Sequence, residues 1–316
     1  MARAIHMMKN LMRVLLNMLI VAAIPGFIYL VFLLLKPERF GSLESMFLLL
    51  QQSIVPTIAS MGLLFILYMG LFDFSIGAIL VMSSLIGLTF THIYGYPGYI
   101  LGCIITAVLL ELINATLYTV LKIPSLIVTV GTMMMFEAVG TFIVPTDVQL
   151  PYAYSAFGRY PANLILGLIS LVIAYILLDR TRYGIYVKAI GRHEIVAKRM
   201  GVNPAKIKFY GFLTCGFFVG MGAISLSSYI GSMVPQMTMN SLMRVFVPVI
   251  GCFIGITLKN YCNVVIGTLV GQFTLNMITM GLIMLRVDAA IQNSIVGLLL
   301  IALVAITSIK KTEIVK

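Results

Sequence analysis

Residues 179–208 read DRTRYGIYVKAIGRHEIVAKRMGVNPAKIK, and they form the only long polar stretch in this chain of 316 residues. This stretch, called the basic segment below, holds eight of the 21 Lys and Arg residues. Apolar residues make up 61% of the chain and charged residues 10%, whereas about a quarter of a soluble domain is charged. The basic segment therefore interrupts a membrane protein, and it is the part best suited to a partner outside the membrane.

Apolar runs of about 20 residues recur on both sides of the basic segment, and each can cross a hydrocarbon core of roughly 30 Å as a helix. We predict an all-α integral membrane protein, a polytopic helical bundle with a single transmembrane domain over residues 1–316. The first run is too long for a signal peptide and is expected to be retained. The ten predicted spans are 14–35, 53–71, 76–93, 99–121, 126–144, 161–178, 209–230, 245–258, 264–285 and 289–308.

Basic residues predict the orientation of these spans. With the N-terminus inside, the inner segments hold 16 Lys and Arg residues and the outer segments hold five. Because cytoplasmic loops carry the excess of positive charge, both termini and the basic segment are expected in the cytoplasm of a multi-pass cell (inner) membrane protein. The net charge of +11 is then explained by the orientation in the membrane, and we expect no nucleic-acid binding. The outer segment 145–161 is either an aromatic belt at the interface or a lip for an outside partner.

Pairs of small residues four apart let two membrane helices approach closely. They occur at Gly98/Gly102, Gly216/Gly220, Gly251/Gly255 and Gly267/Gly271. Each pair predicts ordinary helix packing, and their density in the last third of the chain favours a tight bundle or a dimer face.

The sequence lacks the motifs of an enzyme. It has no HExxH metal site, no paired-Asp motif for polyprenyl chemistry and no phosphate-binding GxxxxGK[ST] loop. The four cysteines include no CxxC pair and are read as buried thiols. We therefore expect no catalytic residue, no metal and no cofactor.

Acidic residues inside apolar runs need a physical reason, because charge at membrane depth is costly. Asp73 lies in GLFDFSIG between the second and third spans, a junction that predicts a tight re-entry or a broken helix. Asp73 either caps the third span or forms part of a polar lining. Glu111 and Asn114 share one face of the fourth span. Glu111 and Glu137 either bind neighbouring helices or line a path.

A short helix is predicted over residues 192–200 of the basic segment. Glu194 and Lys198 have the favourable i,i+4 order, and Val196 and Met200 form an apolar stripe. Gly201 suits the C-terminal cap, and the following Pro204 prevents continuation. Such a helix either rests on anionic membrane lipids or docks a cytoplasmic subunit.

Three stretches resemble the sugar-type ABC importer permeases, the ribose and xylose kind. GLFDFSIGA (70–78) is similar to the family's G-G-I-D-L-S-V-G-S, and IPSLIVTVGT (123–132) is similar to P-S-F-I-V-T-L-G-T. The basic segment matches T-x-x-G-R-x-x-x-A-I-G-x-N-x-x-A-A-x-x-x-G-I at Thr181, Gly184, Ala189-Ile190-Gly191, Ala197 and Gly201-Val202. The stretches occur in the family's order and together cover most of residues 55–230. Departures at Ile185, Arg192-His193 and 249–255 mark a divergent member.

The resemblance implies a non-catalytic permease subunit of an ATP-driven importer for a sugar or a similar small polar solute. It implies ABC-type ATPase subunits in the cytoplasm, an extracytoplasmic solute-binding protein and a second permease subunit, identical or different. The residues expected to couple to the ATPase are Gly191, Glu194, Ala197, Lys198 and Gly201. The polar residues expected in the translocation path or in a structural role are Asp73, Glu111, Asn114, Thr129, Thr132 and Glu137.

Two other functions fit the composition. An ATP-independent secondary transporter or channel would use Asp73, Glu111 or Glu137 to carry a coupling ion. A structural membrane scaffold would have no solute-binding partner. Neighbouring genes for an ATPase and a secreted binding protein would favour the importer.

The predicted orientation can be tested by thiol labelling. In a background without cysteine, a single cysteine at Ser155 should react with a membrane-impermeant reagent from outside, and one at Lys206 should not. The reverse pattern would show that the orientation is inverted.

Overall fold

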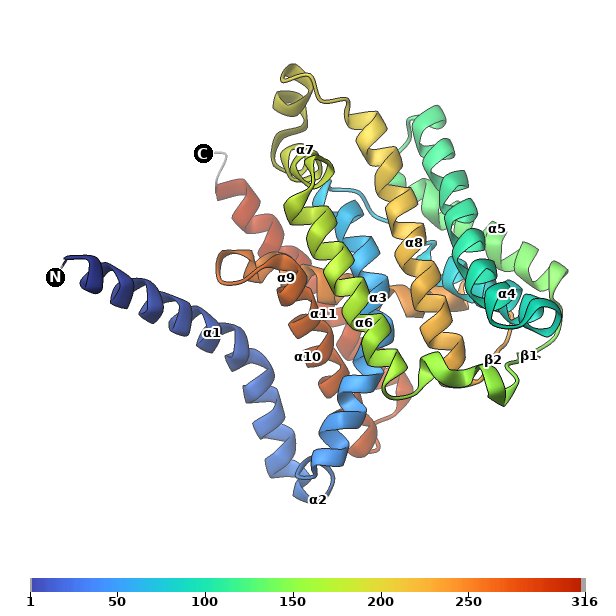
Figure 1. Cartoon of the computed structure of the whole chain (residues 1–316), viewed down its shortest axis with the longest axis horizontal. Coiled ribbons are helices and arrows are strands. Elements are labelled where there is room, and N and C mark those ends of the chain that lie inside the picture. Colours follow the sequence, from blue (N-terminus) through green and yellow to red (C-terminus); the bar gives the residue numbers. More distant parts are fainter. Residues whose placement is uncertain (1, 314–316) are drawn as a thin grey trace. The chain divides into compact units, whose positions relative to one another are not determined.

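The computed structural model describes residues 2–313, and helices make up most of it (Figure 1). Within that range, eight helices are long and apolar enough to cross a membrane, and a shorter apolar helix covers Ala289–Ala305. Two of the ten predicted spans lie in one helix of 46 residues, and the last predicted span lies in the helix Ala289–Glu313, of which Ala289–Ala305 is the apolar part described. The all-α polytopic prediction is confirmed.

The chain forms two compact units. The larger comprises Ile54–Pro248, and the smaller comprises the residues up to Ser53 together with those from Val249 onward. The elements that contribute to the larger unit are α3 (Leu43–Tyr68, from Ile54), α4 (Ile76–Leu121), α5 (Ser125–Ile143), β1 (Val148–Gln149), η1 (Tyr152–Gly158), α6 (Ala162–Tyr175), the π-helical turn η2 (Ile176–Arg180), α7 (Arg182–Arg199), α8 (Pro204–Ile230), β2 (Ser232–Met233), η3 (Asn240–Leu242) and the start of α9 (Met243–Thr257).

Helix α4 contains the third and fourth predicted spans, and it turns back at Gly95 (φ 61°, ψ −145°) (Figure 1). Only glycine adopts this backbone conformation readily. The two arms then pack closely, since a Cβ on Gly102 would lie 3.0 Å from the Cα of Gly87. The predicted small pair at Gly98 and Gly102 therefore joins the two arms of one helix.

Helix α8 packs along α4 within the larger unit. A Cβ on Gly216 would lie 2.9 Å from the carbonyl oxygen of Ala107, and one on Gly220 would lie 2.7 Å from the Cα of Ile104. The predicted Gly216/Gly220 pair is thus the contact face of α8 against α4.

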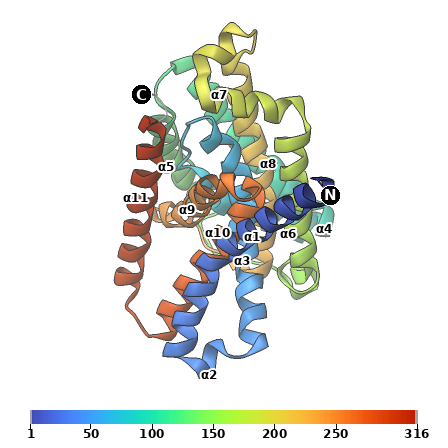
Figure 2. The same cartoon turned by 90° about the vertical axis from the view of Figure 1, so that its left-hand side faces the viewer.

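The smaller unit contains α1 and α11 at its two ends in sequence. Its elements are α1 (Ala2–Leu35), α2 (Pro37–Phe40), the first half of α3, the end of α9, η4 (Leu258–Asn260), α10 (Val264–Met284) and α11 (Ala289–Glu313). The chain reverses direction through α2 between α1 and α3 (Figure 2). Phe32, Phe40, Leu49 and Met277 form a buried apolar cluster here.

The other two glycine pairs contact each other in this unit. A Cβ on Gly271 would lie 2.8 Å from the carbonyl oxygen of Gly251, and one on Gly267 would lie 3.1 Å from the Cα of Gly255. Close approach of α9 and α10 therefore uses both pairs.

The segment 145–161, predicted to lie outside, folds against the turn of α4. Residues of β1 pair with β2 in an antiparallel two-residue ladder, and the Tyr96 and Tyr154 rings are 4.8 Å apart. Ser155 is only 8% exposed, whereas Tyr152 is 76% exposed. The labelling experiment therefore needs its outer cysteine at Tyr152, because a buried thiol at Ser155 would react slowly on either side.

Because α4 and α8 are in close contact at Gly220, we expect Gly220→Leu to lower the stability of the folded protein strongly. The added side chain must displace the backbone of α4, and overpacking of this kind typically costs about 1–3 kcal/mol. The melting temperature of the purified protein should fall by several degrees. Gly131→Leu on α5 is the matched control, because a Cβ at Gly131 meets no atom within 4 Å. An equal loss in both variants would contradict the packing argument.

Candidate functional site: the basic segment and the polar core

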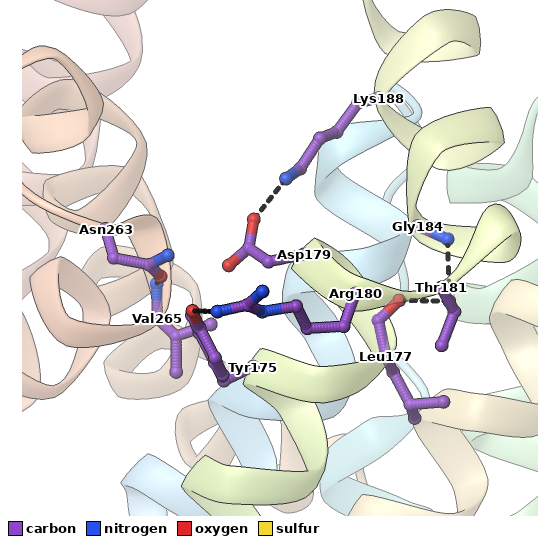
Figure 3. A network of polar contacts seen from close by, with 9 residues as sticks. All are labelled: Tyr175, Leu177, Asp179, Arg180, Thr181, Gly184, Lys188, Asn263 and Val265. Atoms are coloured by element: carbon purple, nitrogen blue, oxygen red, sulfur yellow. Dashed lines mark hydrogen bonds and ion pairs between the residues drawn. The ribbon is translucent and has the colours of Figure 1, made fainter.

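The basic segment begins with a capped turn (Figure 3). Thr181 is the N-cap of α7, and its hydroxyl accepts a hydrogen bond from the backbone N–H of Gly184 at 3.2 Å. The same hydroxyl donates to the carbonyl oxygen of Leu177 at 2.6 Å. Lys188 forms an ion pair with Asp179 just before the turn. These contacts fix the direction in which α7 leaves η2.

The segment ends with the cap that the sequence predicts. Helix α7 breaks at His193 (φ −151°, ψ 94°) and ends at Arg199. Gly201 has φ +86°, and the N–H of Val202 donates to the carbonyl oxygen of Ala197 at 3.1 Å. This is the Schellman pattern, which satisfies carbonyl groups at the helix end. The predicted short helix and its glycine cap are confirmed.

The part of α7 before the break is seated against α3 and α8. A Cβ on Gly191 would overlap the carbonyl oxygen of Tyr68, so only glycine allows this approach. The Tyr183 ring stacks on Phe65 at 5.8 Å, and its hydroxyl lies 3.3 Å from that of Thr214. Burial raises the pKa of Tyr183 to about 12, so the phenol stays neutral.

The part after the break is held by an ion pair that sequence reasoning missed. The ammonium group of Lys208 on α8 lies 2.9 Å from both carboxylate oxygens of Glu194, and 3.4 Å from the hydroxyl of Tyr118. The sequence instead favoured Lys198 as the helical neighbour of Glu194. The Lys208 side chain is only 10% exposed, and a buried ammonium needs a partner more than an exposed one does.

The outward face of this part is apolar with a basic border. Ile195, Val196 and Met200 are 71%, 52% and 79% exposed, while Lys198 and Arg199 lie exposed beside them. These three apolar residues are called the apolar knob below. Ala197, expected in coupling, is 3% exposed and points inward. Ile195 was missed because it lies outside the i,i+4 stripe.

An open groove of about 620 Å³ lies beside the Glu194–Lys208 pair. The loop after α3 and the α4–α5 connection line it through Phe72, Tyr118, Lys122 and Ser125. The groove therefore brings the first two resembling stretches next to the third.

The polar residues predicted at membrane depth fall into two groups. Asp73, Glu111 and Asn114 lie together, each 2% exposed or less. The Asn114 amide donates to the Ser75 hydroxyl at 2.7 Å and to Glu111 Oε2 at 3.0 Å. Asp73 Oδ1 accepts from the N–H and the hydroxyl of Ser75 at 2.8 and 2.6 Å. Sequence reasoning did not bring Asp73 and Glu111 together, because they are distant in the chain.

Glu137 lies apart from that cluster. Its carboxylate accepts from the N–H groups of Met239 and Ser241 at 2.8 and 2.9 Å, where Thr238 and Met239 both have positive φ. Glu137 thus holds a strained turn before α9.

The two threonines have backbone partners. Thr129 Oγ1 accepts from the N–H of Phe74 at 3.1 Å, and the Thr132 hydroxyl donates to the carbonyl oxygen of Thr129 at 3.2 Å. Thr129 therefore holds the backbone of the junction before α4, and the Thr132 hydrogen bond lies within α5.

Fold and site define a multi-pass helical membrane protein with one anchored polar segment. The family model described as "Branched-chain amino acid transport system / permease component" matches residues 45–304. The chain belongs to this family of transport permeases. It is a non-catalytic permease component of an import system of the cell membrane, and such components work with partner ATPases and solute-binding proteins.

Curated relatives are import permeases. The fructose import permease protein FrcC of Rhizobium meliloti is 29% identical over 288 residues, which cover 85% of this chain and 79% of the relative. The autoinducer 2 import system permease protein LsrC of Photorhabdus luminescens is 26% identical over 276 residues, which cover 84% of this chain and 82% of the relative. LsrC of Yersinia pestis is 24% identical over 274 residues, with 84% and 77% covered. No solved structure gives a significant match.

We expect the Glu194–Lys208 ion pair to stabilise the C-terminal end of α7. Lys208→Met keeps the apolar stem and removes the ammonium group. A partly exposed pair contributes up to about 1 kcal/mol, so amide hydrogen exchange over residues 194–202 should accelerate up to about fivefold. Lys206→Met, an exposed lysine on the same helix, should leave it unchanged. Equal exchange in both variants would show that the pair does not hold the helix.

Proposed function

We propose that this chain imports a sugar or a similar small polar solute, driven by an ATPase that docks on the apolar knob of α7. The import systems of the relatives carry fructose and autoinducer 2, and both names support a small polar cargo. Such a subunit breaks no bonds. It provides the path and responds to the ATPase.

The observation that carries the proposal is the contrast between the two sides of α7. Its inner side is fixed through Gly191 and Glu194, and its outer side exposes three large apolar residues. Apolar side chains surrounded by charge are typical of protein interfaces. A lipid-facing surface helix would have less need of a rigid seat.

The contacts of α7 with α3 and with α8 could each transmit a movement of α7 to the membrane helices. Gly191 rests on Tyr68, the last residue of α3, and the loop 69–75 follows directly. Lys208 is in α8 and lies close to Tyr118 of α4. A movement of α7 would therefore reach α3, α4 and α8 together. Nucleotide binding can drive it only by favouring one of the two arrangements.

The finer assembly belongs to the same proposal. Both termini and the basic segment lie in the cytoplasm, from the 16-to-5 distribution of basic residues. A second permease subunit, identical or different, completes the path. A solute-binding protein delivers the cargo on the opposite side, where the segment 145–161 is exposed at Tyr152 and Tyr160.

The ion-coupled alternative is not favoured by the relatives, which are components of import systems. Its suggested carriers also have structural partners: Glu137 holds the turn before α9, and Asp73 and Glu111 lie in a packed core.

Docking can be tested with Ile195→Asp and Met200→Asp. The subunit is co-expressed with the candidate ATPase from the neighbouring genes and reconstituted in nanodiscs. Because central apolar contacts often contribute 2 kcal/mol or more, the affinity for the ATPase should fall about 30-fold and transport should be lost. The amount of inserted protein should not change.

Ile185→Asp is the matched control. Ile185 is 60% exposed on the same helix but lies before the break at His193, so its change should have little effect on binding. Unchanged ATPase binding by both knob variants would exclude the knob as the docking site.

A further inference from the structure

Two carboxyl groups meet in the core of the larger unit. Asp73, on the loop between α3 and α4, and Glu111, on the second arm of α4, are 2% and 0% exposed. Polar ligand atoms of the two residues and of Cys215 on α8 all lie within 4.8 Å of one another. The membrane function described above gives this pair no task.

Each carboxyl group has one oxygen with donors and one without. Asp73 Oδ1 accepts two hydrogen bonds from Ser75, and Glu111 Oε2 accepts one from Asn114. Among the described residues, Asp73 Oδ2 and Glu111 Oε1 have no donor. A proton bound between these two oxygens would give both of them a hydrogen-bond partner.

We propose that Asp73 and Glu111 share one proton and together form a buried proton-binding site with a single negative charge. Two adjacent carboxylates in a low-dielectric core repel each other strongly, so both cannot be ionised. The donors of Ser75 and Asn114 go to Asp73 Oδ1 and Glu111 Oε2, an arrangement that stabilises one remaining charge. The shared proton makes Asp73 Oδ2 and Glu111 Oε1 donor and acceptor to each other.

A proton fits this site better than a metal ion. A cation attracts lone pairs, yet the neutral groups that contact Asp73 Oδ1 and Glu111 Oε2 are N–H and O–H donors. Asn114 uses its amide nitrogen for both of these contacts, and its buried Oδ1 accepts no hydrogen bond from the described residues. The groups that interact with the pair are Ser75, the backbone of Ile76, Asn114 and Cys215, and none of these carries a positive charge.

The shared proton links the loop 69–75, through Asp73, to the second arm of α4, through Glu111. Without it, loop 69–75 would carry an uncompensated repulsion toward α4. With it, an amide can replace either carboxyl group, because an amide N–H donates where the shared proton does. Asp73→Asn and Glu111→Gln should therefore each fold and lower the melting temperature by less than about 4 °C. Glu111→Ala, which removes the donor and leaves a cavity, should lower it more.

Infrared spectroscopy measures the proton directly. The full chain in nanodiscs at neutral pH should show one carbonyl band of a protonated carboxylic acid that shifts in D₂O. The band should disappear in Asp73→Asn and also in Glu111→Gln, since one proton needs both carboxyl groups. Asp179→Asn, which changes a carboxylate paired with Lys188, should leave the band unchanged.

Three results would overturn the proposal. Absence of the band in the unchanged protein would mean that both groups are ionised. Survival of a protonated-acid band in either single variant would mean that the groups hold separate protons. A stoichiometric divalent cation in the purified protein that is lost in Glu111→Gln would make the site a metal site.

Discussion

The break between α3 and α4 sets the constraint on which the rest of the larger unit depends. Hydrocarbon offers no hydrogen bonds, so every backbone N–H freed by a broken helix needs a partner inside the protein. Here the N–H of Phe72 donates to the Ser125 hydroxyl, that of Phe74 to the Thr129 hydroxyl, and that of Ser75 to Asp73. Two of the stretches that resemble sugar-type permeases are therefore the two halves of one hydrogen-bonded junction.

The third stretch meets the same junction from the side of the basic segment. Gly191 contacts the end of α3, directly before the loop that Ser125 and Thr129 hold. Three short stretches that are far apart in sequence thus converge where α3 ends. Their common position gives a physical reason why the stretches occur together: each supplies a hydrogen bond or a close contact that the others cannot.

Sequence reasoning succeeded where a property is local and periodic. Apolar length placed the spans, and glycine with proline placed the end of α7. It could not foresee contacts set by tertiary packing. Glu194 pairs with Lys208 and not with Lys198, and Asp73 lies beside Glu111 although a whole helical arm separates them in sequence. Burial inside the polar segments was also hidden from the sequence: Ser155, chosen for labelling, and Ala197, expected in coupling, are both buried.

One face of α8 connects the Glu194–Lys208 ion pair with the proposed proton site at Asp73 and Glu111. Lys208 and Cys215 are seven residues apart, two helical turns or about 10 Å along one face, and Phe212 between them packs on Tyr118 with ring centroids 5.7 Å apart. On α4, Tyr118 and Glu111 have the same spacing and meet Lys208 and Cys215 respectively. The glycines that follow on α8 keep the two helices in close contact. Because packed helices move as rigid bodies, a shift of α8 imposed at Lys208 must also act on the carboxyl pair. In the proposed mechanism, the single negative charge on that pair therefore contributes to the free energy of the movement of α7.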